Sequence, residues 1–363
     1  NEIIYKPAAT SGENIYYIIL DGLVSYDYFL EITDDKSNTF GHFDSKLQKL
    51  DFKLYPNSRA SYNLTYLTLG SILEMNYYNQ DLVYKNRDEF FPKVLYQKKP
   101  PPLLANLNNI GYEFIYSGNF WAQCRFSENF SCANRAINRD SFTPLDKLVY
   151  FTNNAGIQTL TSRSTLGFLI RRASSSFGTA LLDDGLENFL NSGIDLIKPR
   201  TKKFYFIHNE APHPPYPNKN CKIDPSQSYT TWGSEDDYSF AVSCALDKTM
   251  ASIDRIMELD PTAIIVLQGD HGASMNYDWM ANPLSMTKES LIERFSIYNA
   301  IRAPQKCHAQ KFDALGNVET INLVFNCISN NNPTEVINKS FAAVYEENRE
   351  LFGRLYEVTG NIK

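Results

Sequence analysis

The chain has 363 residues and carries a formal net charge of -6 at pH 7. This length is enough for one large α/β domain or two ordinary domains, and either can bury a substantial core. The acidic balance gives no electrostatic reason to expect nucleic acid as a partner, because binding of nucleic acid normally needs a basic surface. A polyanionic partner would therefore have to be held locally, for instance by a metal ion.

Residues 1–13 are expected to be an extended leader or linker that follows a membrane anchor missing from this sequence, which begins at Asn1 without a methionine. No apolar run of about eighteen residues occurs, so we do not expect the given chain to span a membrane. The segment 164–182 places two arginines beside an apolar run, which favours a core-facing helix, with an amphipathic membrane-surface helix as the alternative.

Six cysteines pair by sequence distance, and none lies in a Cys-x-x-Cys motif. We expect three disulfides, which are Cys124–Cys132, Cys221–Cys244 and Cys307–Cys327. Disulfides persist in oxidising compartments, so this pattern favours a location outside the cytoplasm. The alternative is that the six cysteines are buried thiols that act as small hydrophobic side chains.

Three apolar runs end abruptly on polar or charged side chains. Runs of β-branched and aromatic residues bounded in this way are typical of strands in a parallel sheet, buried on both faces. The carboxyl ends of parallel strands lie at one edge, where open α/β sheets carry their sites, so we expect these side chains to converge. The runs are 15–20 before Asp21, 204–207 before His208, and 263–267 shortly before Asp270 and His271.

These strand ends supply chemistry that suits a divalent cation. Asp21 and Asp270 offer hard carboxylate oxygens and His271 offers an imidazole, while Gly272 permits a sharp turn directly after them. Taken alone, Asp21 is equally compatible with an N-cap of the next helix, and the Asp-His pair favours a capped turn over a pair of ligands. His213 follows in a proline-rich loop, so two of the five histidines lie within six residues.

The apolar spacing of residues 64–75 predicts a helix that begins with a cluster of Ser, Asn and Thr. A hydroxyl at a helix N-terminus lies at the positive end of the helix dipole, which favours its alkoxide and an arriving anion. The alternative is a threonine that only caps the helix. The remaining predicted elements are strands at 52–55, 112–116 and 294–301 and helices at 103–109, within 155–197 and at 236–258.

Taken in order, these segments resemble the alkaline phosphatase and sulfatase superfamily, in particular membrane-anchored bacterial sulfatase-like proteins related to phosphoethanolamine and phosphoglycerol transferases (lipoteichoic acid synthase-like). The resemblance covers about residues 14–330. Its motifs are Tyr17–Gly22, Ser61–Thr65 followed by Leu69–Tyr77, His208 with Pro212–Pro215, and Gln268–Gly272. It implies an α/β fold of three α/β/α layers with a central, mostly parallel sheet, and a small C-terminal subdomain. The implied division is 1–13 leader, 14–303 sulfatase-like catalytic domain and 304–363 C-terminal subdomain.

The resemblance also implies one divalent metal ion, Zn²⁺ or Mn²⁺, held by Asp21, Asp270, His271 and the Oγ of Thr65. Three oxygens and one imidazole suit these ions, and a bound cation lowers the pKa of a hydroxyl that it touches. Thr65 is then expected to attack phosphorus and form a covalent phospho-threonine intermediate. Its distance from Asn76 and Tyr77 matches the family's helix, and Ser61 is the main competitor for the nucleophile.

His208 and His213 are expected to bind phosphate oxygens or to protonate the leaving group, which suits side chains that titrate near neutrality. Asn63 is the third expected substrate-binding residue. The sequence departs from true sulfatases because it has no Cys-x-Pro-x-Arg or Ser-x-Pro-x-Arg motif, so hydrolysis of sulfate esters is disfavoured. Gly22 rather than a second carboxylate follows Asp21, which favours one metal ion over two.

The leading hypothesis is an extracytoplasmic, metal-dependent phosphotransferase of the periplasm or outer face of a bacterial inner membrane. It would move a phosphoethanolamine or phosphoglycerol headgroup from a phospholipid donor to a surface glycan or lipid acceptor, at a membrane surface reached through the missing anchor. Two alternatives remain open. One is a phosphodiesterase or phosphatase that uses water as the acceptor, and the other is a catalytically silent relative that binds envelope lipid.

Overall fold

The computed structural model describes residues 12–33, 38–118, 130–132, 185–190, 197–222, 232–276, 282–307, 313–329, 331, 337–345 and 350–362. Within these ranges the chain forms one seven-stranded sheet in the order β2-β7-β6-β1-β5-β3-β4 and one two-stranded sheet of β8 and β9. The strands are β1 Ile15–Leu20, β2 Phe52–Leu54, β3 Glu113–Ser117, β4 Ser131–Cys132, β5 Lys203–Asn209, β6 Ile264–Gly269, β7 Asn299–Arg302, β8 Phe341–Ala343 and β9 Leu355–Glu357.

The central strands of the large sheet run parallel. β1 lies between β5 and β6 and pairs with both in parallel, and β3 continues the parallel part. β7 runs antiparallel to β6, and β2 runs antiparallel to β7. The register sets Leu20 opposite Gly269 and Ile19 opposite His208. The three polar segments predicted from the sequence therefore leave the same edge of the sheet, as expected.

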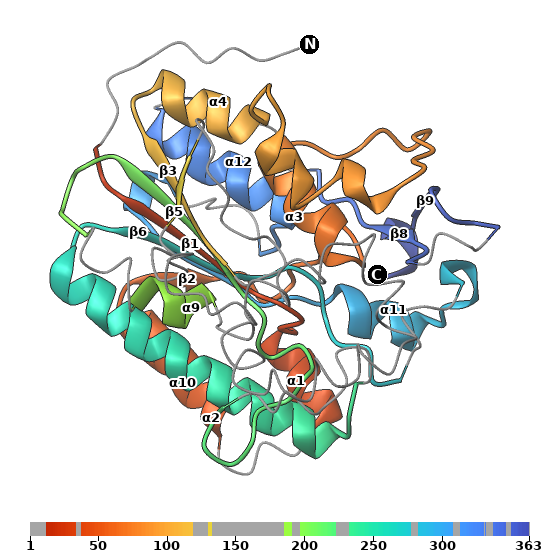
Figure 1. The fold of residues 1–363 in the computed structure, drawn as a ribbon. Coiled ribbons are helices and arrows are strands. Elements are labelled where there is room, and N and C mark those ends of the chain that lie inside the picture. The colour runs from red at the N-terminus through yellow and green to blue at the C-terminus, as the bar shows by residue number, and fades with distance from the viewer. Residues whose placement is uncertain are drawn as a thin grey trace, which may run out of the picture.

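Both faces of the sheet are covered by helices, which makes three layers (Figure 1). One face carries α1, α2, α9 and α10, and the other carries α3, α4 and α12. The helices with eight or more residues are α2 Thr39–Lys49, α3 Thr65–Glu74, α4 Pro102–Asn109, α10 Glu235–Leu259, α11 Lys288–Phe295 and α12 Asn317–Ile328, and the shorter ones are α1 Tyr26–Ile32 and α9 Gly185–Asn188. The predicted three-layer α/β fold is confirmed.

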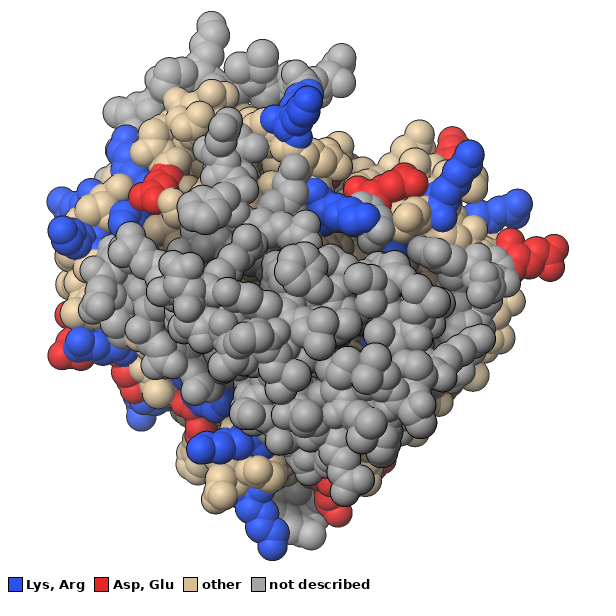
Figure 2. Space-filling model, in the orientation of Figure 1, with Lys and Arg blue, Asp and Glu red and all other residues tan. Residues whose placement is uncertain are grey.

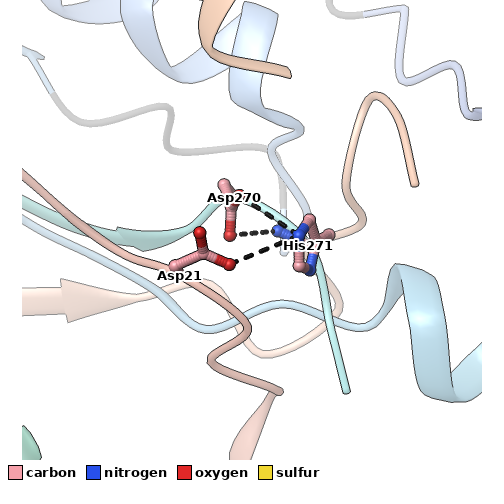
Figure 3. A group of neighbouring side chains, drawn as sticks. All are labelled: Asp21, Asp270 and His271. Carbon is pink, nitrogen blue, oxygen red and sulfur yellow. Dashed lines mark hydrogen bonds and ion pairs between the residues drawn. The ribbon is translucent and has the colours of Figure 1, made fainter. Parts of the chain in front are cut away.

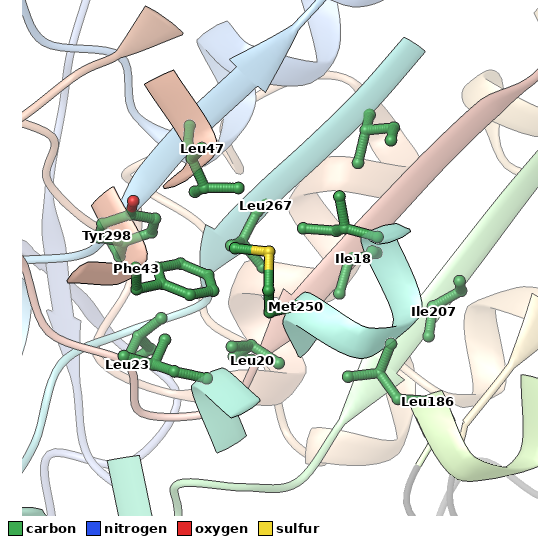
Figure 4. Packing of buried hydrophobic residues seen from close by; sticks show 14 of the residues in the cluster. Ile18, Leu20, Leu23, Phe43, Leu47, Leu186, Ile207, Met250, Leu267 and Tyr298 are labelled. Carbon is green, nitrogen blue, oxygen red and sulfur yellow. The ribbon is translucent and has the colours of Figure 1, made fainter. Parts of the chain in front are cut away.

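Alternation along β1 explains the two cores. Tyr16, Ile18 and Leu20 pack on the face covered by α2 and α10, and the residues between them pack on the opposite face. Figure 4 shows the first of these cores, where Leu267 of β6 and Met250 of α10 lie beside the β1 side chains. A strand buried on both faces needs a nearly continuous apolar sequence, which is the pattern seen in the runs around these positions.

Most predicted elements agree with the structure to within about two residues at each end. The predicted strand at 294–301 is wrong in its first half, because Arg294 and Phe295 form the last turn of α11. The side chain of Thr287 caps this helix by accepting from the amide of Ser290. This N-cap residue is a local helix signal that the strand prediction from residues 294–301 did not take into account. The predicted helical segment from 155 to 184, and the alternative at 164–182, lie outside the described residues.

Residues after 303 combine helix α12 with the small sheet. The apolar side chains of α12 belong to the same core as α3 and α4, whereas β8 packs on the loop that precedes α3. Two predicted disulfides are confirmed, Cys221–Cys244 and Cys307–Cys327, the second of which ties a short turn to α12. Cys124 of the third predicted pair lies outside the described residues. The predicted domain boundary near residue 303 stays a prediction.

The surface of the described residues mixes both signs of charge. On the face drawn in Figure 2, both Lys or Arg and Asp or Glu side chains are visible around the rim. Among the helices in the described ranges, none has the length and apolarity needed to cross a membrane.

Candidate metal and nucleophile site

Asp21, Asp270 and His271 meet at the carboxyl edge of the sheet. Asp21 follows the last residue of β1, and the other two follow β6 directly. One potential ligand atom from each residue lies within 4.8 Å of the other two, and all three side chains are buried (Figure 3). The Nε2 atom of His271 lies 3.4 Å from Asp21 Oδ1 and 3.4 Å from Asp270 Oδ2. The predicted ligands are thus brought together.

Backbone hydrogen bonds fix the orientation of the Asp270 carboxylate. Its Oδ1 accepts from the amides of Gly22 at 3.0 Å and His271 at 2.8 Å, so the two strand ends are joined by one side chain. Gly22 has φ +77°, and a Cβ there would lie 2.8 Å from the indole of Trp232. The turn after Asp21 therefore needs glycine, because other residues are strained at this φ and would meet Trp232.

The other oxygen of each carboxylate has no hydrogen-bond partner among the described residues. These atoms are Asp21 Oδ1 and Asp270 Oδ2, both buried. His271 Nδ1 lies 2.9 Å from the carbonyl oxygen of Gly272, which can only accept, so Nδ1 carries the proton and Nε2 presents its lone pair to the carboxylates. Three lone-pair donors therefore point at one another without a donor hydrogen between them, which is the arrangement that a cation completes.

Electrostatics support the same interpretation. Burial and the negative charge of Asp21 raise the pKa of the Asp270 carboxyl to about 7. Burial and the positive charge of Arg294 lower the pKa of His271 well below its usual value, which keeps the imidazole neutral. Two buried carboxylates side by side repel each other, and a neutral imidazole ligates metal ions, so the donor set fits a divalent cation such as Zn²⁺ or Mn²⁺.

Thr65 brings its hydroxyl to this group. It is the first residue of α3, and its Oγ1 lies 2.9 Å from His271 Nε2 and 3.4 Å from Asp21 Oδ2. Thr65 is partly exposed, unlike the carboxylates behind it. The amides of the first turn of α3 point in the same direction as the positive end of its dipole, so an anion approaching Thr65 is favoured.

The Ser61 hydroxyl, the alternative nucleophile, lies elsewhere. Ser61 is fully buried, and its Oγ accepts from the amide of Val318 at 3.4 Å. Its own amide donates to the side chain of Asn317 at 2.8 Å. The geometry therefore favours Thr65. Its hydroxyl contacts Asp21 and His271, whereas the described contact of the Ser61 hydroxyl is with the amide of Val318.

His208 and His213 approach the site from β5 and from the loop after it. His208 is fully buried, and its Nε2 lies 3.6 Å from Asp21 Oδ2. Burial alone would lower the pKa of His208, but the contact with Asp21 raises it overall. His213 donates its backbone amide to the carbonyl of Asp21, and its ring lies 6.3 Å from the ring of His271 and 5.0 Å from that of Trp232. Both predicted histidines thus adjoin the carboxylate group.

Asn63 is held against the small sheet. Its Nδ2 donates to the carbonyl of Ala343 at 3.0 Å, and its Oδ1 accepts from the amide of Ala343 at 2.8 Å. The side chain is 1% exposed. These contacts fix the loop that leads into α3, and the predicted role of Asn63 in binding substrate stays a prediction.

Two buried side chains that the sequence did not single out also contact this region. Arg294, at the end of α11, donates to the carbonyls of Asn63 and Gly272. Asn317, the first residue of α12, contacts Ser61 and Gly269. Neither lies in a strand-end motif, so their contacts with this region become visible only in the tertiary structure. For Asn317 the available signal was its position behind Gly316, at the start of an apolar helix.

A mostly parallel α/β sheet with this cluster at its carboxyl edge is the fold of alkaline phosphatase-like proteins. The family model described as Sulfatase matches residues 13–314, so the chain belongs to the Sulfatase family, as the sequence motifs predicted. No curated protein sequence matches the chain.

Solved structures agree in fold. The C-terminal periplasmic domain of EptC from Escherichia coli is 14% identical, with 97% of this chain and 96% of that chain covered and a TM-score of 0.51. The same domain in complex with Zn gives 13% identity, the same coverage and a TM-score of 0.51. The phosphonate monoester hydrolase SpPMH from Silicibacter pomeroyi is 12% identical, with 92% and 79% covered and a TM-score of 0.50.

Proposed function

We propose that the chain is a metal-dependent enzyme that transfers a phosphorus-containing group, with Thr65 as the nucleophile. The observation that carries this proposal is the contact of the Thr65 hydroxyl with both Asp21 and His271, at the N-terminus of a helix. Asp21, Asp270, His271 and Thr65 Oγ1 would hold one divalent ion. When bound, that ion would neutralise charge on the phosphoryl oxygens and lower the pKa of the threonine hydroxyl.

In the first half-reaction, Thr65 Oγ forms a bond to phosphorus and loses its proton, while the bond from phosphorus to the leaving oxygen of the donor breaks. In the second half-reaction, the acceptor hydroxyl forms the new bond to phosphorus and the bond to Thr65 Oγ breaks. We assign His208 and His213 to the phosphoryl oxygens and to the proton on the leaving group. His213 Nδ1 lies 2.7 Å from the carbonyl of Pro214, which holds a proton on Nδ1. Its Nε2 would therefore first accept the proton that Thr65 loses and then donate it to the leaving oxygen of the donor.

The donor that we propose is a phospholipid with a phosphoethanolamine or phosphoglycerol headgroup, and the acceptor is a surface glycan or lipid. The fold is shared with a phosphoethanolamine transferase domain and with a phosphonate monoester hydrolase, so transfer to water is the other outcome that an assay has to detect. The sequence carries no Cys-x-Pro-x-Arg or Ser-x-Pro-x-Arg motif, which argues against sulfate esters despite the family's name.

We also propose that the protein works outside the cytoplasm, in the bacterial periplasm or at the outer face of the inner membrane. The two disulfides in the described residues support this location, because intracellular thiols are kept reduced. The pairs join positions 23 and 20 residues apart, so each closes a short local loop.

The test is turnover of headgroup-labelled phosphatidylethanolamine and phosphatidylglycerol by protein that has been treated with a chelator and then reloaded with Zn²⁺ or Mn²⁺. The proposal predicts metal-dependent release of diacylglycerol, with the label on protein or acceptor. Release of free phosphoethanolamine or glycerol phosphate identifies the hydrolase. If no metal binds and neither lipid is consumed, the chain is a silent relative and the catalytic proposal fails.

A further inference from the structure

The loop before α3 and the turn after β6 are joined from behind by the side chain of Asn317. Its Oδ1 accepts from the Ser61 amide at 2.8 Å, and its Nδ2 donates to the carbonyl of Gly269 at 2.9 Å. Ser61 lies four residues before Thr65, and Gly269 lies directly before Asp270. One fully buried amide therefore bridges the segment that carries the nucleophile and the strand end that carries two metal ligands.

Arg294 makes a second bridge between the same two segments. Its Nε donates to the carbonyl of Asn63 at 2.8 Å, and one terminal nitrogen donates to the carbonyl of Gly272 at 3.0 Å. Asn63 lies two residues before Thr65, and Gly272 directly follows His271. Arg294 is 2% exposed, and the planar fork of its guanidinium holds two acceptors at a fixed separation, which a flexible ammonium does not do.

The two bridges come from different helices and act on either side of the metal-ligating pair. Asn317 is the first residue of α12 and donates to the carbonyl of Gly269, directly before Asp270. Arg294 lies in the last turn of α11 and donates to the carbonyl of Gly272, directly after His271. Gly272 allows the close approach, because a Cβ there would lie 2.0 Å from the carbonyl oxygen of Glu293. Together the bridges tie the nucleophile segment to the strand end at two points, which fixes both distance and rotation.

We propose that Asn317 and Arg294 are a pair of positioning residues that clamp Thr65 against the Asp270–His271 strand end and thereby set the rate of nucleophilic attack. The inference rests on the proposed function and extends it to residues whose hydrogen bonds go to the segments on either side of the proposed ligands and nucleophile. A displacement of a nucleophile by about 1 Å costs roughly 100-fold in rate, so each bridge acts mainly on kcat and leaves KM nearly unchanged.

The first test needs neither metal nor substrate. The Ser61 amide donates to Asn317, so replacing Asn317 by Ala should speed hydrogen exchange of that amide by about fivefold or more, in line with the loss of one hydrogen bond. Asn14→Ala is the matched control and should leave exchange of the Ser61 amide unchanged. Asn14 is as buried as Asn317, but it bridges the Lys198 carbonyl and Asp260 at the opposite edge of the sheet. Unchanged exchange at Ser61 in Asn317→Ala would overturn the clamp.

The second test is kinetic, with labelled phosphatidylethanolamine and Zn²⁺. Asn317→Ala and Arg294→Met should each lower kcat by roughly 10- to 100-fold with KM within about threefold of wild type. Arg294→Lys keeps the positive charge but cannot reproduce the two hydrogen bonds of the guanidinium, so its kcat should lie between those of Arg294→Met and wild type. A purely electrostatic role of Arg294 predicts wild-type kcat in Arg294→Lys. The control for Arg294 is Arg302→Met. Arg302, like Arg294, donates to backbone carbonyls, in its case three, but it lies at the opposite edge of the sheet.

Circular dichroism first establishes that each variant is folded, and Asn317→Ser and Arg294→Lys replace any variant that is not. The clamp is overturned if folded variants keep wild-type kcat, if only KM changes, or if the far-edge controls lose as much rate. If the wild-type protein itself transfers nothing, the proposed function fails, and exchange at Ser61 still decides whether Asn317 holds the segment.

Discussion

Glu319 of α12 is a buried carboxyl whose ionisation should destabilise the folded chain. Its side chain is 8% exposed, and the Tyr77 hydroxyl lies 2.9 Å from both of its oxygens. Burial raises the pKa of Glu319 from 4.5 to about 7. The folded state therefore keeps a proton on Glu319 over a pH range in which the unfolded chain has lost it.

The sign of the effect follows from that difference. The contribution of the protonated Glu319 carboxyl to the free energy of unfolding is complete below pH 4.5, and it is lost as the pH rises through about 7. The gap between these two values corresponds to roughly 3 kcal/mol of unfolding free energy. Glu319→Gln removes the titration and keeps an oxygen that accepts from Tyr77, so its stability relative to wild type should rise by about 2–3 kcal/mol between pH 5 and pH 8.

Urea denaturation followed by circular dichroism at the two pH values measures this difference directly. Glu258→Gln, whose side chain is 67% exposed on α10, is the control for loss of a surface carboxylate. If the curves of Glu319→Gln and wild type stay parallel from pH 5 to pH 8, the carboxyl is not held protonated in the folded protein, and the reasoning from burial is refuted.

Three further predictions concern the site and its surroundings. Gly22→Ala should lower the free energy of unfolding by about 1–3 kcal/mol, because it places a Cβ at φ +77° and against Trp232; an unchanged urea midpoint would contradict this. Asp270→Asn should weaken Zn²⁺ binding by roughly 100-fold or more in calorimetry, and it should stabilise the metal-free protein at pH 8 since it relieves the repulsion with Asp21; equal Zn²⁺ affinity would argue against the site. Opening Cys221–Cys244 by Cys244→Ser should cost about 3 kcal/mol, and a thermal midpoint equal to wild type would show that this loop is held by other contacts.

The strand ends were readable from the sequence because their signal is local. The run 15–20 is apolar at every position and stops at Asp21, so its burial on both faces and the edge where it ends could be predicted together. The same holds for the strand before Asp270. Strands buried on both faces belong to parallel sheets, so β1 and β6 were expected to pair in parallel. Their register brings the carboxylates of Asp21 and Asp270 side by side.

What the sequence did not show depends on contacts between distant segments. Arg294 was predicted to begin a strand, yet it lies in the last turn of α11 and donates to the carbonyl of Asn63, which lies 231 positions away. Asn317 bonds Ser61 across 256 positions. Asparagine and arginine are common surface residues, and no local pattern marks the ones that are buried against backbone groups. Their role becomes visible only when the two segments are seen to lie together.

The identity of the nucleophile is the central claim about this site. Wild-type protein and Thr65→Ala, both reloaded with Zn²⁺ and shown to be folded, should be quenched in acid during turnover of labelled phosphatidylethanolamine and measured by intact mass and peptide mapping. We expect a phosphoethanolamine adduct on Thr65 in the wild type and none in the variant. An adduct that persists in Thr65→Ala, or that maps to Ser61, would contradict it.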